Sequence, residues 1–371
     1  MSQIYADHAA GTPTDPQVIE AMAPYWQDNF GNPSSVHTFG KKTADAVDRA
    51  RGVIATFLGI DPEEIIFTSS GTESNNLAIL GIARASKNRG HHLVTTSIEH
   101  PSVLNACKAL ERDGFTVTYV SPEEDGTIDT NKLVAAVTKE TTLISVHLAN
   151  SEIGVIQDVA EIARQVKEKN SNALVHVDAC QATPFLDLNV RQLGADLLTF
   201  NGSKMYGPKG IAALYVRSGV SIFPIMYGGG QEQSLRSGTE NVPGIVGLAK
   251  AVGLVDAKKD SQRIGALRDR LQHELEKLGC RSNCAHSSRL PNHLSVTLPH
   301  TQSTNLVADL DQLGVAVSAG SACSSRSLTE SHVLTAIGLS SEEINRTIRI
   351  TLGRSTTAEN CQQLIAAIKQ I

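Results

Sequence analysis

A single lysine, Lys204, lies where a buried strand is expected to end in a tight turn. The stretch reads Thr199-Phe200-Asn201-Gly202-Ser203-Lys204-Met205-Tyr206-Gly207-Pro208-Lys209-Gly210, and apolar runs flank it at 195–200 and 211–216. An amine presented from such a turn can form a Schiff base with a carbonyl group. An ordinary hairpin lysine explains this stretch alone equally well, so the decision rests on the remaining residues.

A carboxylate, Asp178, closes another apolar run upstream, at 174–178. An unpaired charge at the end of a buried strand is unfavourable. It becomes favourable when it meets a pyridinium N–H, because the ion pair keeps the ring nitrogen protonated and makes pyridoxal phosphate an electron sink. The alternative is that Asp178 caps the next segment. Asp178 and Lys204 together indicate a pyridoxal phosphate site.

A possible phosphate site precedes the expected helix 74–85. The turn before it reads Ser69-Ser70-Gly71-Thr72-Glu73. Free backbone N–H groups and the positive end of the helix dipole bind anions at such a position. The stretch lacks the Gly-Lys-Ser/Thr ending of a Walker loop, and a plain capped helix explains it as well.

Strand-like and helix-like segments alternate along the first part of the chain. Apolar runs predict strands at 65–68, 93–96, 115–120, 143–148, 173–177, 195–200 and 211–216, and helical spacing predicts helices at 16–27, 39–58, 74–85, from 101, 129–137 and 159–169. This alternation predicts an α/β fold with a mostly parallel, helix-covered sheet. Ligands bind such sheets at the carboxyl ends of the strands, where residues 70–72, 99–100, 150–152, 178 and 204 fall.

The pattern changes after residue 216. A polar loop (228–241) precedes a helical region at 242–278 that we expect to break near Asp260. Short strands follow at 293–298, 315–317 and 346–352, with helices after 305, 331 and 357. We therefore expect a large cofactor-binding domain at 15–255 and a smaller α+β domain made of 1–14 and 256–371.

Composition excludes several classes of protein. Hydrophobic residues make up 41% of the 371 residues, charged residues 19%, and the net charge is −5, which is typical of a globular domain rather than a disordered chain. The basic residues are dispersed, so no nucleic-acid surface is expected. No apolar run is long enough for a membrane helix, and no secretory signal is visible. The cytoplasm is the expected location.

The 6 cysteines are Cys107, Cys180, Cys280, Cys284, Cys323 and Cys361. They are few and scattered, so we expect reduced thiols rather than a disulfide framework. Cys280, Cys284 and His286 lack the second ligand pair of a structural zinc site, so no metal site is expected.

The chain resembles the cysteine desulfurases of the NifS/IscS type, which are fold-type I pyridoxal phosphate enzymes of the class V aminotransferase family. The matching motifs span nearly the whole chain and are Asp7-His8-Ala9-Ala10, Gly31-Asn32-Pro33-Ser34-Ser35, Gly71-Thr72-Glu73-Ser74-Asn75-Asn76, Glu99-His100, Asp178-Ala179-Cys180-Gln181, Lys204-Met205-Tyr206-Gly207-Pro208-Lys209-Gly210, Gly228-Gly229-Gly230-Gln231-Glu232, Arg236-Ser237-Gly238-Thr239, Gly320-Ser321-Ala322-Cys323-Ser324 and Arg349-Ile350-Thr351-Leu352-Gly353. The resemblance implies a seven-stranded sheet in the large domain and a homodimer with shared active sites.

The resemblance also implies a role for each matching residue. Lys204 would hold the cofactor and move the Cα proton, Asp178 would pair with the ring nitrogen, and Gln181 would bond the ring hydroxyl. His100 would stack on the ring and act in acid/base steps. The phosphate would be held by Gly71, Thr72 and Ser203, with Thr239 reaching in from the partner subunit. Arg349 would bind the substrate carboxylate through its guanidinium fork, assisted by Asn32.

The resemblance assigns the step that distinguishes this reaction, the transfer of sulfur, to Cys323. Its neighbours in Ser318-Ala319-Gly320-Ser321-Ala322-Cys323-Ser324-Ser325 are all small, so we expect a flexible loop that buries little apolar area. The resemblance implies that its thiolate takes sulfur from L-cysteine, leaves L-alanine, and passes the persulfide to an acceptor in iron–sulfur assembly, tRNA thiolation or DNA phosphorothioation. Cys323 could also serve as a transient iron–sulfur ligand. A small buried hydrophobe is the commoner fate of a free cysteine, and the loop composition argues against it.

Two positions depart from the family pattern. Ser203 stands where the family usually has histidine, and Ser151 stands where the family asparagine contacts the ring or the substrate. Three alternatives stay open: a selenocysteine lyase, an aminotransferase, or a non-catalytic sulfur carrier or scaffold. Substrate tests with cysteine, selenocysteine and a keto acid separate the enzymes, and an absorbance spectrum of the purified protein tests the non-enzyme.

Overall fold

The computed structural model describes residues 3–299, 303, 305–320 and 330–371. The strands are β1 (Ile4–Tyr5), β2 (Ile65–Thr68), β3 (His92–Thr96), β4 (Thr116–Val120), β5 (Thr141–His147), β6 (Leu174–Asp178), β7 (Leu197–Asn201), β8 (Ala212–Val216), β9 (Arg281–Ser282), β10 (His293–Thr297), β11 (Val315–Ala316) and β12 (Thr347–Thr351). The α-helices are α1 (Pro16–Met22), α2 (Pro24–Gln27), α3 (Thr38–Leu58), α4 (Gly71–Ala85), α5 (Pro101–Arg112), α6 (Thr130–Ala136), α7 (Val159–Lys169), α8 (Val190–Leu193), α9 (Val242–Gly253), α10 (Ala257–Glu276), α11 (Leu306–Gln312), α12 (His332–Ala336), α13 (Ser341–Asn345) and α14 (Ala358–Ile368).

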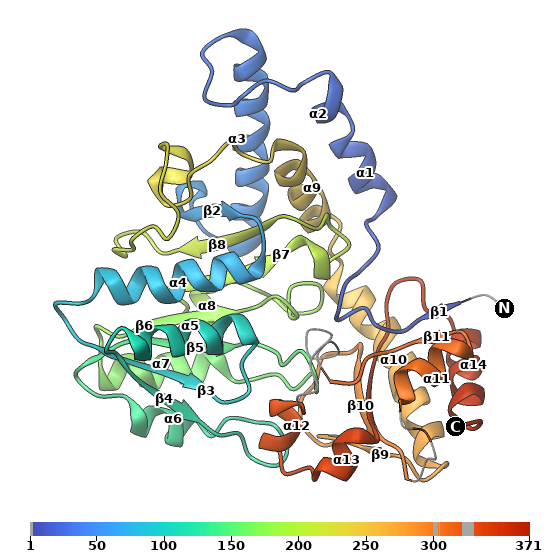
Figure 1. Ribbon diagram of the computed structural model, residues 1–371. Helices are drawn as coiled ribbons and strands as arrows, with labels where there is room; N and C mark the ends of the chain where they lie inside the picture. Colours follow the sequence, from blue (N-terminus) through green and yellow to red (C-terminus); the bar gives the residue numbers. More distant parts are fainter. Residues whose placement is uncertain (1–2, 300–302, 304, 321–329) are drawn as a thin grey trace.

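A seven-stranded sheet in the order β2-β8-β7-β6-β5-β3-β4 forms the centre of the molecule (Figure 1). β8 pairs antiparallel with both of its neighbours, and the other neighbouring strands pair in parallel. The expected mostly parallel α/β sheet is confirmed. The parallel strands end at one edge, which brings the residues that follow β5, β6 and β7 together.

Successive residues of the strands face opposite layers of helices, because side chains alternate along a strand. Ile66, Leu93 and Leu143 pack in one apolar cluster with residues of α4 and α5. Their neighbours in sequence, Phe67 and Val94, pack in another cluster with residues of α3, α7 and α9. Burial on both faces explains why these strands read as continuous apolar runs.

The C-terminal part contains a second, antiparallel sheet in the order β12-β10-β9. β1 pairs in parallel with β11, so the N-terminal segment lies against the C-terminal part of the chain (Figure 1). This pairing holds the N-terminal residues close to β12, and Asp7 also bridges to Thr351.

Several element boundaries differ from the sequence-based expectation. The helix expected at 16–27 is two helices, because Pro24 cannot continue the hydrogen bonds of α1. The helix expected from residue 74 begins at Gly71, capped by Ser70. The break expected near Asp260 lies at 254–256, where Asp256 caps α10 and Asp260 is inside that helix.

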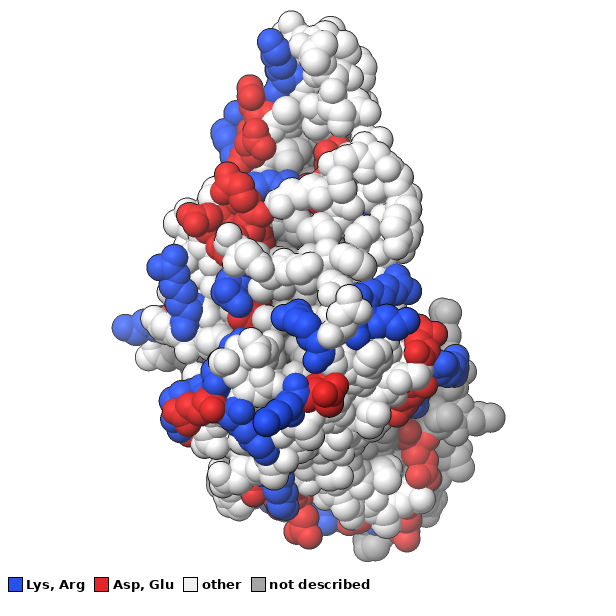
Figure 2. Space-filling model, turned by 90° about the vertical axis from the view of Figure 1, so that its left-hand side faces the viewer, with Lys and Arg blue, Asp and Glu red and all other residues white. Residues whose placement is uncertain are grey.

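Among the described residues, no helix is both long and apolar enough to cross a bilayer. Figure 2 shows acidic and basic side chains interspersed over the face it presents.

Candidate active site

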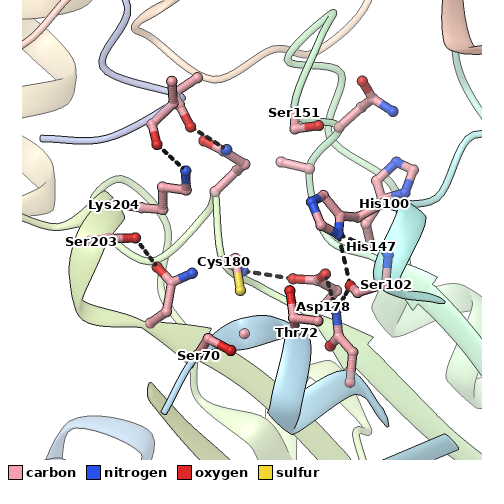
Figure 3. A pocket seen from close by; sticks show the side chains of 18 of the residues that line it. Ser70, Thr72, His100, Ser102, His147, Ser151, Asp178, Cys180, Ser203 and Lys204 are labelled. Atoms are coloured by element: carbon pink, nitrogen blue, oxygen red, sulfur yellow. Dashed lines mark hydrogen bonds between the residues drawn. The ribbon is translucent and has the colours of Figure 1, made fainter. Parts of the chain in front are cut away.

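A cavity of about 280 Å³ lies at the carboxyl ends of β5, β6 and β7. Its lining combines strand-end residues, the start of α4 and segments from both ends of the chain (Figure 3). The lining residues are Ala9, Ala10, Ser70, Gly71, Thr72, Asn75, Ile98, His100, Ser102, His147, Ala149, Asn150, Ser151, Asp178, Cys180, Gln181, Asn201, Ser203, Lys204 and Arg349. Most of the site residues expected from the sequence therefore share one cavity.

Lys204 ends a short 3₁₀ turn that follows β7. Its Nζ donates a 2.6 Å hydrogen bond to the carbonyl oxygen of Ala10. The next turn is fixed by Tyr206, which adopts a left-handed backbone with φ 61°. The Tyr206 hydroxyl accepts a hydrogen bond from the backbone N–H of Arg354, whose guanidinium lies 4.4 Å from the tyrosine ring centre. Contacts on both sides of the turn thus hold the lysine in place.

Asp178 ends β6 and is only 7% exposed. Oδ2 accepts a 2.7 Å hydrogen bond from Asn75 Nδ2, and Oδ1 accepts one of 3.0 Å from the backbone N–H of Cys180. Burial by itself would raise the pKa of Asp178, but the nearby imidazole of His100 and these hydrogen bonds outweigh it and hold the pKa below its ordinary value. The cavity therefore contains an ionised, acceptor-only group.

His100 caps α5 and lines the cavity. Its Nδ1 lies 2.7 Å from Ser102 Oγ and accepts a 3.1 Å hydrogen bond from the Ser102 backbone N–H. Ser102 Oγ in turn accepts a 2.9 Å hydrogen bond from Asn75 Nδ2. Asn75 thus contacts both the carboxylate of Asp178 and the serine that contacts the imidazole.

A second histidine, His147, ends β5 beside Asp178. Its Nδ1 lies 2.8 Å from Oε1 of the buried Glu99. Burial lowers the pKa of His147, but the neighbouring Glu99 carboxylate more than offsets this, so the pKa lies above its ordinary value. His147 therefore lines the cavity with the carboxylate of Glu99 beside its ring.

The start of α4 forms another wall of the cavity. Ser70 Oγ accepts from the backbone N–H of Glu73, and the backbone oxygen of Ser70 accepts from Ser74. The N–H groups of the first turn precede any intrahelical acceptor, and the helix dipole adds positive potential there. A Cβ on Gly71 would lie 2.7 Å from Cys180 Sγ, so only glycine leaves this approach open.

Arg349 is 3% exposed and lines the cavity from β12. Its Nη2 donates a 2.7 Å hydrogen bond to Asp7 Oδ1, and its Nη1 donates one of 2.9 Å to the backbone oxygen of Ser151. Ser318 Oγ donates to the other oxygen of Asp7. The guanidinium is therefore held by an acidic partner within the site.

This set of donors and acceptors fits pyridoxal phosphate. Asp178 can accept from a protonated ring nitrogen, and the start of α4 with Thr72 and Ser203 can donate to a phosphate. Gln181 lines the same cavity, and its Nε2 donates a 3.0 Å hydrogen bond to the backbone oxygen of Ala9. Lys204 supplies the amine that a carbonyl cofactor requires.

Two predicted site residues lie elsewhere, and a third is not among the described residues. Asn32 and Thr239 are exposed and do not line the cavity, and Asn32 Oδ1 accepts from the backbone N–H of Ser34 instead. Within a single chain, the position of Asn32 therefore does not support the expectation that it assists Arg349. Cys323 lies outside the described residues, and the other cysteines are free thiols.

The sequence reasoning missed Asn75, Ser102 and His147 as parts of the site. His147 could have been found, because it ends a strand at the same edge as Asp178. Asn75 falls in a motif that matches the family, but the resemblance was not used to give it a role. Ser102 gave no signal, since it lies inside a helix that reads as an ordinary amphipathic segment. Ser151, one of the two departures, contacts Arg349 through its backbone, and a backbone contact does not depend on the residue type.

Comparisons with known proteins agree with this site. The sequence pattern of the aminotransferase class-V family matches residues 4–364. Cysteine desulfurase IscS of Dictyoglomus turgidum is 43% identical over 373 residues, which covers 100% of this chain and 94% of that protein.

Two solved structures are also similar. A NifS-like protein superposes with a TM-score of 0.94 at 36% identity and covers 99% of this chain and 98% of its own. The structure of SspA in complex with cysteine has a TM-score of 0.84 at 38% identity, over 94% of this chain and 98% of its own. The chain belongs to the cysteine desulfurases of the NifS/IscS type within the aminotransferase class-V family.

Proposed function

We propose that this protein is a pyridoxal phosphate-dependent cysteine desulfurase that converts L-cysteine to L-alanine and passes the sulfur on as a persulfide. The observation that carries the proposal is the shared cavity that brings Lys204, Asp178, His100 and Arg349 together at the strand ends. The complex of the related SspA with cysteine supports cysteine as the substrate.

The cofactor, when bound, supplies an electron sink that stabilises negative charge at the substrate carbon next to the amino group. The protein residues do the rest. Arg349 binds the substrate carboxylate, Asp178 keeps the ring nitrogen protonated, and Lys204 Nζ holds the cofactor and then takes the Cα proton. His100 presents its imidazole to the reacting groups as acid or base.

The sulfur step assigned to Cys323 balances without an added oxidant. The Cys323 thiolate attacks the sulfur of the substrate, an S–S bond forms, and the Cβ–S bond breaks with its electron pair going to the substrate. A proton then completes the methyl group of alanine. Cysteine and the Cys323 thiol thus give alanine and a Cys323 persulfide.

The role of Lys204 is tested by the visible absorbance of the cofactor-loaded protein. We expect Lys204→Ala to lose the absorption band of the covalently held cofactor and all alanine formation. Lys209→Ala is the matched control, because Lys209 Nζ contacts the backbone oxygen of Thr12 and does not line the cavity. An unchanged band in Lys204→Ala would overturn the assignment.

We further propose that the enzyme works as a homodimer. Aromatic and branched side chains are unusually exposed where the chain passes from α2 to α3: Trp26 is 65%, Phe30 66% and Val36 89% exposed. In Figure 2 the right-hand part of the top of the molecule is free of charged side chains, while acidic and basic side chains line its left edge. Contiguous exposed apolar surface of this kind marks an interface, and a second copy would bring Thr239 to a neighbouring cavity.

Mixed dimers test whether Thr239 serves the partner's cavity. We choose Thr239→Glu, because its charge would repel the phosphate, and mix it with Lys204→Ala after reversible dissociation. Each hybrid then contains one intact site if Thr239 acts across the interface, and about a quarter of wild-type activity returns for random pairing. If Thr239 acts within its own chain, the mixture stays as inactive as either variant.

The immediate product, a persulfide, requires a sulfur-accepting protein as partner. Incubation of the persulfidated enzyme with candidate acceptors, followed by detection of labelled sulfur, identifies that protein. We place the reaction in the cytoplasm on the strength of the sparse cysteines, which the described residues keep as free thiols.

A further inference from the structure

We propose that Asn75 and Ser102 are positioning residues that fix His100 as a neutral ring with its proton on Nε2. The inference rests on the proposed function, because it concerns the imidazole that serves the cofactor site. Its evidence is a chain of hydrogen bonds that runs from Asp178 through Asn75 and Ser102 to His100 (Figure 3).

The Asp178 carboxylate determines which atom donates in each hydrogen bond of this network. An ionised carboxylate only accepts hydrogen bonds, so the atom of Asn75 that faces Asp178 Oδ2 at 2.7 Å must be the donor Nδ2. The second hydrogen of the same Nδ2 goes to Ser102 Oγ at 2.9 Å. Both hydrogens of the amide are thereby used.

The Ser102 hydroxyl is then the donor to the imidazole of His100. Its hydroxyl oxygen accepts from Asn75, so its own hydrogen is available for His100 Nδ1 at 2.7 Å. The backbone N–H of Ser102 donates to the same nitrogen at 3.1 Å. A ring nitrogen that accepts hydrogen bonds carries no proton, so the network assigns the proton of the neutral ring to Nε2.

The state of Asn75 indicates that it acts as a double donor. Its side chain is almost completely buried, and among the described residues no hydrogen-bond partner contacts its Oδ1. An orphaned buried acceptor destabilises the fold. A hydroxyl or an alanine at this position would avoid that orphan, but neither could donate to Asp178 and Ser102 at once.

The site requires a positively charged cofactor ring and a neutral His100 at the same time. Asp178 is to keep the cofactor ring positively charged, and a protonated His100 would add a like charge to the same small cavity. Burial lowers the pKa of His100, and the charges of Lys204 and His332 act in the same direction. The carboxylates of Asp178 and Glu99 oppose this shift. Two hydrogen bonds that Nδ1 can accept only when it is unprotonated act in the same direction as burial.

Nitrogen-15 NMR of the histidine rings in the cofactor-loaded, full-length protein tests the proposal directly. We expect Nδ1 of His100, assigned with His100→Asn, to have the shift of an unprotonated nitrogen and Nε2 that of a protonated one. A proton on Nδ1 in the wild-type protein would overturn the proposal. This readout does not depend on turnover, so it stays interpretable if cysteine proves not to be the substrate.

Variants at Ser102 and Asn75 test the chain of contacts. Ser102→Ala removes one bond to Nδ1, and we expect the ring to titrate about half to one pH unit higher. If the reaction needs the neutral ring, kcat/KM on the acid side falls about threefold to tenfold, and Ser102→Thr restores it. Asn75→Ala should raise the ring pKa in the same direction although Ser102 is intact, which a simple serine–histidine pair would not produce.

The matched control is Ser145→Ala. Ser145 Oγ lies 2.9 Å from Nδ1 of another buried histidine, His176, and neither residue lines the cavity. Removal of this hydroxyl should leave the titration of His100 and the pH profile unchanged. An unchanged His100 titration in both Ser102→Ala and Asn75→Ala, or an equal shift in Ser145→Ala, would refute the positioning role.

Discussion

Arg349, which lines the cavity, forms an ion pair with Asp7. The guanidinium contacts Asp7 Oδ1 and the Ser151 backbone oxygen, so two of its nitrogens already have acceptors. A substrate carboxylate must share or displace the Asp7 contact, and the charge of Asp7 opposes its approach. The pair therefore orients the arginine but lowers its affinity for the substrate.

Asp7→Asn should lower the KM for cysteine several-fold, because the amide oxygen still orients Arg349 while the opposing charge is gone. Steady-state kinetics measure this. Arg349→Lys is the comparison, because it keeps the charge but loses the planar fork, and its KM should rise. A KM for Asp7→Asn that equals or exceeds the wild-type value would contradict this account of the pair.

At the scale of single residues, the sequence predicted groups whose type alone limits their use. A lone lysine in a turn and a carboxylate at a strand end have few explanations, so Lys204 and Asp178 were expected in one site, and the structure brings them to one cavity. Hydrogen-bond partners could not be predicted in this way. The contact of Asn75 with both Asp178 and Ser102 depends on how α4 and α5 pack, and no local pattern encodes that.

At the scale of elements, the N-terminus of α4 is the part of the site most sensitive to a small change. Gly71→Ala should weaken binding of pyridoxal phosphate by on the order of tenfold to a hundredfold, because the new methyl group would lie 2.7 Å from Cys180 Sγ and force a shift of the phosphate-binding turn. Cofactor titration monitored by absorbance measures the affinity.

A second change and a control define this test. Cys180→Ala in the Gly71→Ala background removes the sulfur and should restore most of the affinity. Gly52→Ala, inside α3 with no atom near its added methyl group, should leave cofactor binding unchanged and stabilise the protein by about 1 kcal/mol. No rescue in the double variant would show that Cys180 is not the obstacle.

Most helices and strands were predictable because their periodicities are strong and their caps are explicit. Asp15, Asp129 and Thr357 cap helices where the sequence suggested starts. The two-residue strands β1 and β9 were not predicted, whereas β11 falls within the strand expected at 315–317. A strand that short has no measurable alternation, and it exists because the distant partner supplies its hydrogen bonds.

At the scale of the whole molecule, one apolar cluster continues from the large sheet into the C-terminal sheet. Phe67 and Val94 belong to the same cluster as Leu294 and Ile348. We propose that the chain forms two domains, one of residues 15–255 and one of residues 1–14 together with 256–371. The apolar core that the two domains share should make them unfold together. Calorimetry should show a single transition, and two resolved transitions would indicate independent cores.

Stability should depend on pH through three buried histidines. Burial lowers the pKa of His8 and His176 to about 4 and that of His293 to about 3. Their folded pKa values lie below the unfolded value of about 6.5, so their contribution is complete above pH 6.5 and is lost as pH falls toward 4. We expect the free energy of unfolding to drop by about 1 to 2 kcal/mol per histidine between pH 6.5 and 5.

Chemical denaturation at several pH values measures this dependence. His176→Gln should reduce the slope, since it removes one group that must stay neutral in the fold. Removal of the exposed His286 should not change it, because that side chain loses little solvent on folding. An equal slope in wild type and His176→Gln would mean that other groups dominate in this range.

The amount of alanine formed from L-cysteine tests whether this cavity carries out desulfuration. Purified protein with pyridoxal phosphate, L-cysteine and a thiol reductant should form alanine and sulfide in equal amounts, turnover after turnover. Cys323→Ser should form neither while keeping the visible band of the cofactor. Wild-type protein that binds the cofactor but yields no alanine, or a Cys323→Ser variant with full turnover, would contradict the claim.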